Sequence, residues 1–455
     1  MHGRTANPST TNDEPLPFLR DPAFRQLLQD IRQTDNRTNW FYIARSWLIL
    51  LIVFAGGVAG LEWVRVSEVG WAGAIVIVIL SGLLVGAGQH HLGVLGHEGS
   101  HRTLFRNRWL NEQASDWLCM YPIFTTTYMY RLQHLAHHQF VNDPDRDPNV
   151  LQMRATDTWP SGPLRPRQLV LFLLRLVSPA RLFAFLRRRA RDNSFASDRD
   201  VYRTASPAPT WPKRLGAVCV FGQLGLNLWL LYRGDWSLLA FLPPAFWVLS
   251  MFVFALLPSS CYHRSRVKPD ISLRVATLQR FTCYFLLFHG LAWLSVLTGR
   301  PAMWYWLVLW FLPLVTVFPL YVLLRQLLQH GNGDRGRLTN TRVFLRPWTV
   351  NFFLLPVGQD YHLPHHLFAS IPHYRLRRLH QAMLAYSDYR EAAIEVAGVI
   401  RSPQGTDRRS VVDVLGAEPA RSADSTFIDS TVLDDCEVIE RDAIRNEERA
   451  STALL

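Results

Sequence analysis

Residues 71–101 read WAGAIVIVILSGLLVGAGQHHLGVLGHEGSH, and this stretch carries the two features that decide the fold. Trp71–Leu95 is the clearest long apolar stretch, with AIVIVILSGLLVGAG (74–88) at its centre, and a helix needs about 20 apolar residues to cross a bilayer core of about 30 Å. The stretch then ends on HEGSH, where His97 and His101 lie one helical turn apart. It therefore predicts a membrane-spanning helix that ends on residues able to bind a metal.

Further apolar stretches flank this helix and pair with one another into three hairpins. The link within each pair is short and holds a single basic residue, Arg65, Arg233 or Arg300. The other basic residues lie on the opposite side, as the positive-inside rule describes. We expect an all-α polytopic membrane bundle of three hairpins, about six spans, entered from the cytoplasm; four spans plus interfacial helices is the alternative. The expected spans are Trp47–Leu61, Trp71–Leu95, Leu215–Tyr232, Trp236–Leu257, Phe281–Leu297 and Met303–Leu324.

The charge of the chain follows the same topology. Its 455 residues carry a formal net charge of +12, and residues 1–400 hold 41 Lys and Arg against 24 Asp and Glu. Because this charge marks the cytoplasmic side of a membrane protein, it gives no support to nucleic-acid binding. Residues 166–190, which end on three consecutive arginines, are expected to form an interfacial amphipathic helix.

Three segments follow from these patterns. Residues 1–45 are polar and lack the apolar run of a signal peptide, so they are expected to be a cytoplasmic N-terminal segment. Residues 46–385 form the membrane domain. Residues 386–455 are expected to be a C-terminal extension that is mostly a disordered acidic tail. Its last part, 401–455, holds seven Arg against twelve Asp and Glu.

Histidine is concentrated in three clusters at the ends of the expected spans. The clusters are HEGSH (97–101), HLAHH (134–138) and HLPHH (362–366), and His330 follows the last span with Gln326 one turn earlier. Positions i, i+3 and i+4 share one face of a helix, so each cluster can direct its imidazoles to one place. Pro364 predicts that the third cluster begins a helix or forms a turn.

The topology brings all three clusters and His330 to one side of the membrane. Imidazole is the commonest neutral metal ligand and suits iron, zinc, copper or nickel. Eight or nine ligands exceed what one ion can bind, whereas two ions with five or six ligands each, some of them water, fit the number. His90, His91, His263, His289 and His373 are expected to be structural or to surround the metal ligands without binding the metal.

The order HxxxH, HxxHH, HxxHH between paired spans resembles the integral-membrane fatty acid desaturase and hydroxylase superfamily. The contexts HHQFVNDPDRDPN (137–149) and GQDYHLPHHLFASIPHYRLRRLH (358–380) are also similar, and the resemblance covers roughly residues 40–385. It implies a non-haem di-iron centre at the cytoplasmic surface that uses O2 to remove hydrogen from a lipid acyl chain. The implied metal ligands are His97, His101, His134, His137, His138, His330, His362, His365 and His366.

The resemblance also sets expectations for the surroundings of the irons. Gln326 stands where some relatives have an Asn that acts through a water molecule. Asp143, Asp147 and Asp360 are candidates for hydrogen-bond acceptors that orient the imidazoles, although the first two also fit a solvated Asp/Pro turn. The chain lacks the HPGG haem motif of a fused cytochrome b5, so an external ferredoxin or cytochrome b5-like protein is expected to supply electrons. The expected location is a membrane, the inner one if the source is bacterial.

Three alternatives remain open at this point. A hydroxylase or a carotenoid ketolase of the same superfamily would carry the same clusters. HEGSH also matches the HExxH motif of zinc metalloproteases, with Glu98 as the general base, but that chemistry leaves the other clusters without a role. A histidine-lined metal transporter would place its ionisable residues within the spans, whereas here they lie at the ends of the spans.

Overall fold

The computed structural model describes residues 16–160, 162–194, 200–204, 208–345 and 348–417, and the statements below refer to these ranges. The predicted all-α membrane bundle is confirmed, because six helices among the described residues are long and apolar enough to cross a membrane. These are α2 Thr38–Val66, α3 Gly70–Ser100, α9 Trp211–Arg233, α10 Trp236–Leu256, α11 Leu273–Thr298, and a last span, Ala302–His330.

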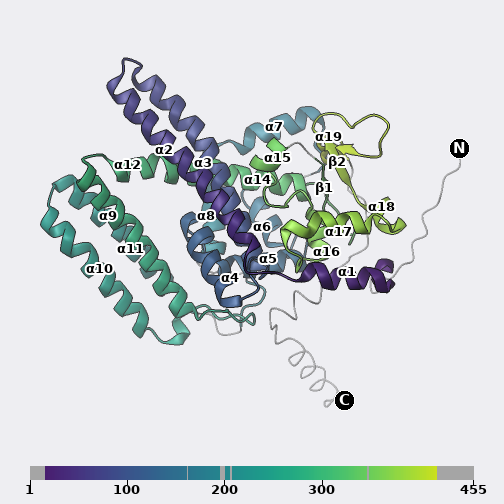
Figure 1. Cartoon of the computed structure of the whole chain (residues 1–455), viewed down its shortest axis with the longest axis horizontal. Coiled ribbons are helices and arrows are strands. Elements are labelled where there is room, and N and C mark those ends of the chain that lie inside the picture. Colours follow the sequence, from purple (N-terminus) through teal and green to yellow (C-terminus); the bar gives the residue numbers. More distant parts are fainter. Residues whose placement is uncertain (1–15, 161, 195–199, 205–207, 346–347, 418–455) are drawn as a thin grey trace, which may run out of the picture.

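The spans pair as expected, and each of the three links turns on a glycine, with Gly70 (φ of 68°) at the start of α3. Gly234 and Gly299 end α9 and α11 with φ of 66° and 63°, the left-handed conformation that glycine adopts without strain. The helices α9, α10 and α11 pack on one another, while α2 packs on α3. Figure 1 shows these two groups extending from the same side of the molecule, with α12 between them.

The last span is assembled from several helical pieces. They are α12 Ala302–Trp306, η5 Leu307–Phe311, α13 Leu312–Val315 and α14 Val317–His330. Pro313 and Pro319 each remove a backbone donor from the helical ladder, and the Thr316 hydroxyl donates to the carbonyl of Leu312 at the break. Neighbouring helices make such breaks tolerable in a membrane.

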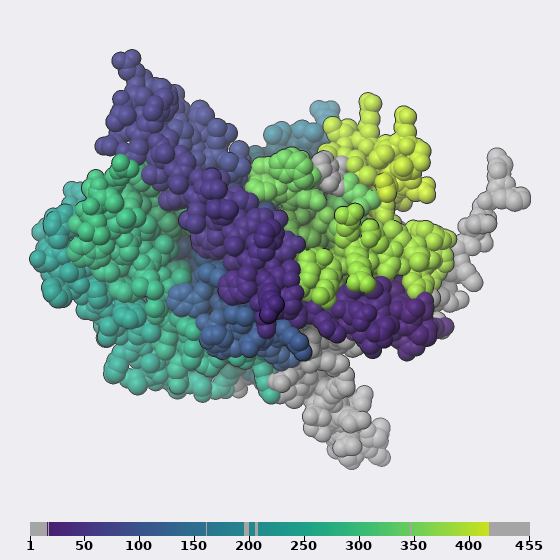
Figure 2. Space-filling view, viewed as in Figure 1, coloured from purple at the N-terminus to yellow at the C-terminus, as the bar shows by residue number. Residues whose placement is uncertain are grey.

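Close helix packing brings α3 against both of its neighbours. A Cβ on Gly88 would lie 2.4 Å from Leu50 of α2, and one on Gly86 would lie 2.5 Å from Val317 of α14. Small residues at these positions let the helix backbones approach one another. The outer faces of α2 and α3 remain exposed and apolar, as at Leu51 and Ile79, and this hairpin stands out from the molecule in Figure 2.

The segment expected to form one interfacial helix is instead two helices, α7 Pro166–Leu176 and α8 Pro179–Ser194, with a bend of 70° between them. Pro179 cannot continue α7, because it lacks the backbone N–H that the helical ladder needs. On α7, Val170, Leu171 and Leu174 are exposed, whereas α8 packs on α5 and α14.

The remaining elements form a cap at one end of the spans. Its helices are η1 Pro17–Arg20, α1 Pro22–Arg32, α4 Arg108–Ser115, η2 Asp116–Met120, η3 Tyr121–Ile123, α5 Thr127–Gln139, α6 Pro148–Arg154, η4 Ser259–Cys261, α15 Trp348–Phe353, α16 His362–Leu367, η6 His373–Arg375, α17 Leu376–Met383, α18 Ser387–Ala392 and α19 Val411–Gly416. A small parallel sheet joins them, in the order β1 Val343–Phe344, β2 Glu395–Gly398, β3 Arg409–Ser410.

Both terminal segments contribute to this cap. The apolar face of α1, with Phe24 and Leu28, packs on α16 and α17. The C-terminal extension differs from the expected disorder over its first half, because β2 pairs with β1, β3 pairs with β2, and Leu415 is buried in a core with Leu327. The backbone N–H of Leu164 also donates to the carbonyl of Leu415. Residues 418–455, the rest of the expected tail, lie outside the described residues.

Candidate metal centre

Four helix ends carry the clustered histidines to one region of the cap. HEGSH closes α3, with His101 as the residue that caps the helix. HLAHH forms the last turns of α5, and His330 is the last residue of α14. The third cluster begins a helix, as Pro364 predicts, because His362 is the first residue of α16. Helix ends are therefore the elements that position these side chains.

The histidines sort into two groups, and each group draws on more than one sequence cluster. Each imidazole offers one nitrogen atom, and within a group all of these nitrogen atoms lie within 4.8 Å of one another. The first group contains His97, His101, His134, His138 and His365, and the second contains His137, His330, His362 and His366. We call them the five-histidine and the four-histidine group.

Helical spacing explains how two of the clusters divide between the groups. His134 and His138 are four residues apart and share the five-histidine group, while His362 and His366 share the four-histidine group. The middle histidine of each cluster, His137 or His365, belongs to the opposite group. Positions i and i+4 overlie one another on a helix more closely than i and i+3, so each short helix supplies both groups.

The distances within the groups suit metal ligands. The Nε2 atom of His134 lies 2.8 Å from Nε2 of His101 and 3.0 Å from Nε2 of His138. In the other group, Nε2 of His362 lies 2.9 Å from Nε2 of His330 and 3.1 Å from Nε2 of His366. Two nitrogens bound at right angles to an ion at ~2.1 Å each are about 3.0 Å apart.

The donor set also fits metal ions. Nε2 of His97 and of His365 are buried and make no hydrogen bond to the described residues, although buried polar atoms normally have a partner. Burial lowers the pKa of His101 to about 3 and that of His365 well below its usual range, and neighbouring positive charge adds to the effect. Both imidazoles are therefore neutral, which leaves a lone pair for a metal. Imidazole nitrogen suits iron, zinc, copper and nickel.

A buried carboxylate holds one imidazole of the four-histidine group. Nδ1 of His137 donates to Asp147, at 2.9 and 3.0 Å from the two carboxylate oxygens. The same carboxylate accepts from the backbone N–H groups of Asn142 and Asn149, each at 2.9 Å, and it caps α6. Asp147 thus turns Nε2 of His137 towards its group, which is the geometry expected of an acceptor that orients a metal ligand.

Glu98 holds an imidazole of the five-histidine group in the same way, and sequence reasoning missed this contact. Its Oε1 lies 3.2 Å from Nδ1 of His97, and its Oε2 accepts from the Thr103 hydroxyl and from the backbone N–H of His373, each at 3.0 Å. The position of Glu98 beside His97 in the sequence was the available signal. Because its oxygens face the outer side of His97, this geometry does not suit the general base of an HExxH protease.

The other polar candidates make their contacts elsewhere. Asp143 forms ion pairs with Arg146 and Arg335, and Asp360 accepts from the side chain of Asn351 at 3.1 Å. Burial raises the pKa of Asp360 to about 6. Gln326 is buried one turn before His330, where its side chain makes no hydrogen bond to another described residue.

A buried ion network supports the end of α3 where HEGSH lies. Arg131, one turn before His134 on α5, donates to the backbone carbonyls of Ser100 and Gly99. Its charge is balanced by Glu112 at 2.6 Å and Asp270 at 3.3 Å. The network joins the first two clusters, and it depends on residues far apart in the sequence, so spacing alone could not reveal it.

Five further histidines lie outside the two groups and have other partners. His90 and His91 bond to the backbone carbonyls of Phe353 and Phe352. His263 pairs with Asp200, His289 bonds to Asn227 and Trp293, and His373 bonds to Asn39.

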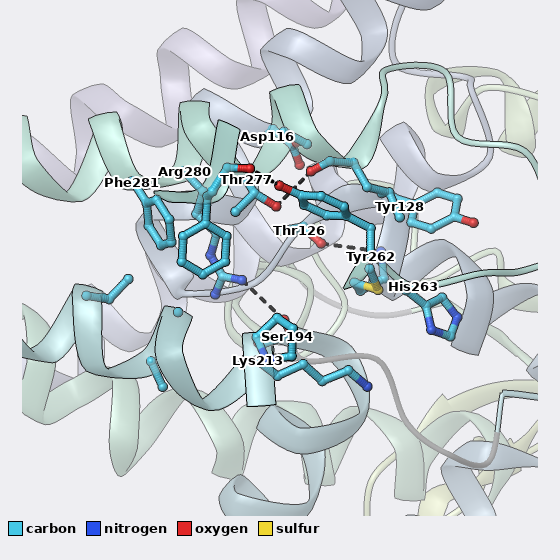
Figure 3. Close-up of a pocket in the computed structure, with 18 of the residues that line it drawn as sticks. Asp116, Thr126, Tyr128, Ser194, Lys213, Tyr262, His263, Thr277, Arg280 and Phe281 are labelled. Carbon is cyan, nitrogen blue, oxygen red and sulfur yellow. Dashed lines mark hydrogen bonds between the residues drawn. The ribbon is translucent and has the colours of Figure 1, made fainter. Parts of the chain in front are cut away.

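A cavity of about 230 Å³ lies where α9, α10 and α11 meet α5 and α8. Figure 3 shows its polar side chains, with Asp116 and Lys213 on opposite sides of it and Phe281 in its wall. None of the nine clustered histidines lines this cavity.

Comparisons with known proteins agree with these features. The sequence matches the family model described as fatty acid desaturase over residues 70–263 and 232–396. It is 27% identical to a dihydrorhizobitoxine desaturase of Bradyrhizobium elkanii over 30% of this chain and 35% of the relative. It is 23% identical to an sn-1 acyl-lipid omega-3 desaturase (ferredoxin) of Nostoc sp. (strain 36), over 50% and 59% of the two chains. An sn-1 oleoyl-lipid 12-desaturase of Arthrospira platensis is 25% identical over 23% and 27%. Each match thus spans less than two thirds of the relative.

Proposed function

This chain belongs to the fatty acid desaturase family, and from that premise we propose that it is a membrane-bound desaturase that dehydrogenates a lipid acyl chain with O2 at a pair of non-haem irons. The observation that carries the proposal is the sorting of nine buried imidazoles into two adjacent groups. A single catalytic zinc needs three protein ligands, so a protease site would leave most of these imidazoles unused.

In this proposal each histidine group holds one iron. Bound iron, together with O2, would supply the oxidising power to break an unactivated methylene C–H bond, which no acidic or basic side chain can do. Asp147 and Glu98 fix the rings of His137 and His97 and raise their basicity. Gln326 is proposed to act through water, while Asp143 and Asp360 stabilise the surrounding loops.

The remaining parts of the proposal concern the membrane and the electron source. The cap, both histidine groups and both ends of the chain face the cytoplasm, because the short links on the other side carry one Arg each while basic residues crowd the cap. A ferredoxin or a separate cytochrome b5-like protein supplies electrons; the relative from Nostoc has ferredoxin in its name. The acyl substrate and the surrounding lipids are the other partners.

Two measurements on the same material test this function. Purified protein should contain close to two irons, and lipids from a host without desaturases should lose two hydrogens per modified chain once the protein is expressed. One zinc without iron contradicts the proposal. A gain of one oxygen in the lipids indicates the hydroxylase or ketolase alternative.

Variants then connect activity to the histidine groups. His137→Ala and His365→Ala, one from each group, should abolish desaturation and lower the iron content while the protein still inserts in the membrane. His289→Ala is the matched control, because His289 lies in α11 and bonds to Asn227 and Trp293 instead. Full activity of either group variant contradicts the assignment.

A further inference from the structure

The cavity between the second hairpin and the cap has two kinds of wall. Apolar side chains of three spanning helices form one part, with Val220 and Phe221 from α9, Phe254 from α10 and Phe281 from α11. The opposite part comes from the cap helices α5 and α8, with Met129 of α5, its N-cap residue Thr126, and Ser194 of α8. We call this cavity the hairpin pocket. Mostly apolar walls with a few polar groups are typical of a ligand site.

Most polar groups of the hairpin pocket already have protein partners. Arg280 donates to the carbonyls of Phe124 and Ser194, and the Tyr262 hydroxyl donates to the carbonyl of Phe254. Asp116 accepts from the backbone N–H of Thr127 at 2.7 Å. Because these bonds are satisfied within the protein, the pocket mainly offers apolar surface to a ligand.

The hairpin pocket reaches the surface that faces the bilayer. Phe221 lines the pocket, yet 52% of it is exposed, and Val218 beside it on α9 is 62% exposed. Since α9 is a candidate span, its exposed side chains face lipid tails. A molecule in the bilayer can therefore reach the pocket sideways, past Phe221.

The depth of the hairpin pocket matches a lipid tail below its headgroup. Trp211, exposed at the start of α9, marks the membrane interface, where Trp is enriched. An interface at Trp211 would put Lys213, two residues on, beside the lipid headgroups. From Lys213 to Phe221 the axis of α9 descends about 12 Å. The apolar walls of the pocket suit the acyl chain of a membrane lipid.

The inner wall of the pocket is the helix that carries the second histidine cluster. Met129 lines the pocket, and His134 follows on α5 after about 7.5 Å of helix axis. Glu112 also lines the pocket and binds Arg131, which holds the end of α3. The pocket therefore adjoins the supports of the histidine groups.

We propose that the hairpin pocket admits the acyl chain of a membrane lipid sideways from the bilayer, past Phe221. This inference rests on the proposed function for its link to catalysis. Binding of the lipid in the pocket can be measured without catalysis.

Filling the pocket tests the proposal. A Cβ on Gly216 would lie 3.6 Å from Phe254 and 3.8 Å from Phe281, in ordinary contact, so Gly216→Leu directs a side chain into the pocket without a backbone clash. Gly225→Leu is the matched control, since Gly225 is on the same helix and faces open space. Ala217→Phe, which also fills the pocket, is a second variant in case Gly216→Leu misfolds.

The first readout is binding. Full-length protein in detergent is incubated with dioleoyl-phosphatidylglycerol, with oleate or with oleoyl-CoA, and native mass spectrometry counts the molecules retained. We expect wild type and Gly225→Leu to retain the phospholipid. Both pocket variants should retain at least tenfold less phospholipid per protein. Retention of phospholipid by folded pocket variants overturns the proposal. The proposal is also overturned if the wild type retains oleate or oleoyl-CoA instead of the phospholipid, because the pocket then prefers another source of acyl chains.

The second readout is turnover. The pocket variants should desaturate phospholipid-bound chains at least tenfold more slowly than Gly225→Leu at equal iron content. If the wild type desaturates nothing, the proposed function fails while the binding result still decides what the pocket holds. If the pocket variants lose the lipid but keep full turnover, the role of the pocket in substrate delivery is refuted.

Discussion

Replacing Asp147 with Asn should weaken metal binding at the four-histidine group alone. The carboxylate accepts from three buried or half-buried donors, Nδ1 of His137 and the backbone N–H groups of Asn142 and Asn149. An amide offers one acceptor oxygen, and its NH2 group must face one of these donors. Leaving a buried donor without an acceptor costs about 1–3 kcal/mol.

The same change removes the negative charge that orients His137. Loss of such an outer partner typically lowers metal affinity about 10- to 100-fold, which corresponds to about 1.4–2.7 kcal/mol. His137 belongs to the four-histidine group, whereas the five-histidine group has its own carboxylate in Glu98. We therefore expect the metal affinity of the four-histidine group to fall about 10- to 100-fold and that of the five-histidine group to stay unchanged.

Cobalt(II) is a convenient probe for this experiment, because its absorption reports binding without turnover. Metal-free protein in detergent is titrated with cobalt(II) against a competing chelator, and two binding steps are fitted. Asp145→Asn is the control, since Asp145 lies in the same turn but is exposed. Wild-type affinity at both steps in Asp147→Asn would refute the reasoning, and so would an equal loss at both steps.

Three further outcomes are expected. Glu98→Gln should give the opposite cobalt(II) pattern, weakening the step of the five-histidine group, because Glu98 holds His97; an unchanged step would count against that contact. Burial lowers the pKa of His373 to about 3, below its unfolded value of about 6.5. As the pH falls, His373 therefore takes up a proton in the unfolded state before it does so in the folded state. The stability that comes from burying neutral His373 is present above about pH 6.5 and is lost as the pH falls towards 3. Thermal unfolding of His373→Asn should consequently vary less between about pH 7 and pH 5 than that of the wild type. Leu415→Ala should lower the free energy of unfolding by about 2–5 kcal/mol, because Leu415 is buried. The exposed Ile400→Ala should change it by no more than about 0.5 kcal/mol, and equal effects of these two variants would show that the C-terminal segment does not pack as described.

The sequence by itself determined the membrane class, the helical architecture and the family. Long apolar runs can satisfy their backbone groups in lipid only as helices, so the six spans could be read without a structure. The three histidine clusters were equally visible, because ligand spacing on a helix is a local property.

Tertiary structure decided how those ligands are shared. His137 and His138 are neighbours in the chain but belong to different groups, and His365 joins residues of α3 and α5. Such a partition depends on how the ends of four helices meet. Glu98 and Asp147 show the same dependence: both were visible as acidic residues, but only the fold directs each carboxylate to the outer nitrogen of one imidazole.

The folded start of the C-terminal extension and the hairpin pocket also required the tertiary structure. Residues 401–417 are polar enough to resemble the acidic tail, yet β3 pairs with β2 and Leu415 fills a core that the rest of the chain supplies. The pocket exists because three spans and two cap helices leave a space where they meet. Local sequence determines which residues are helical or apolar, but long-range packing determines which of them meet, and the site depends on those meetings.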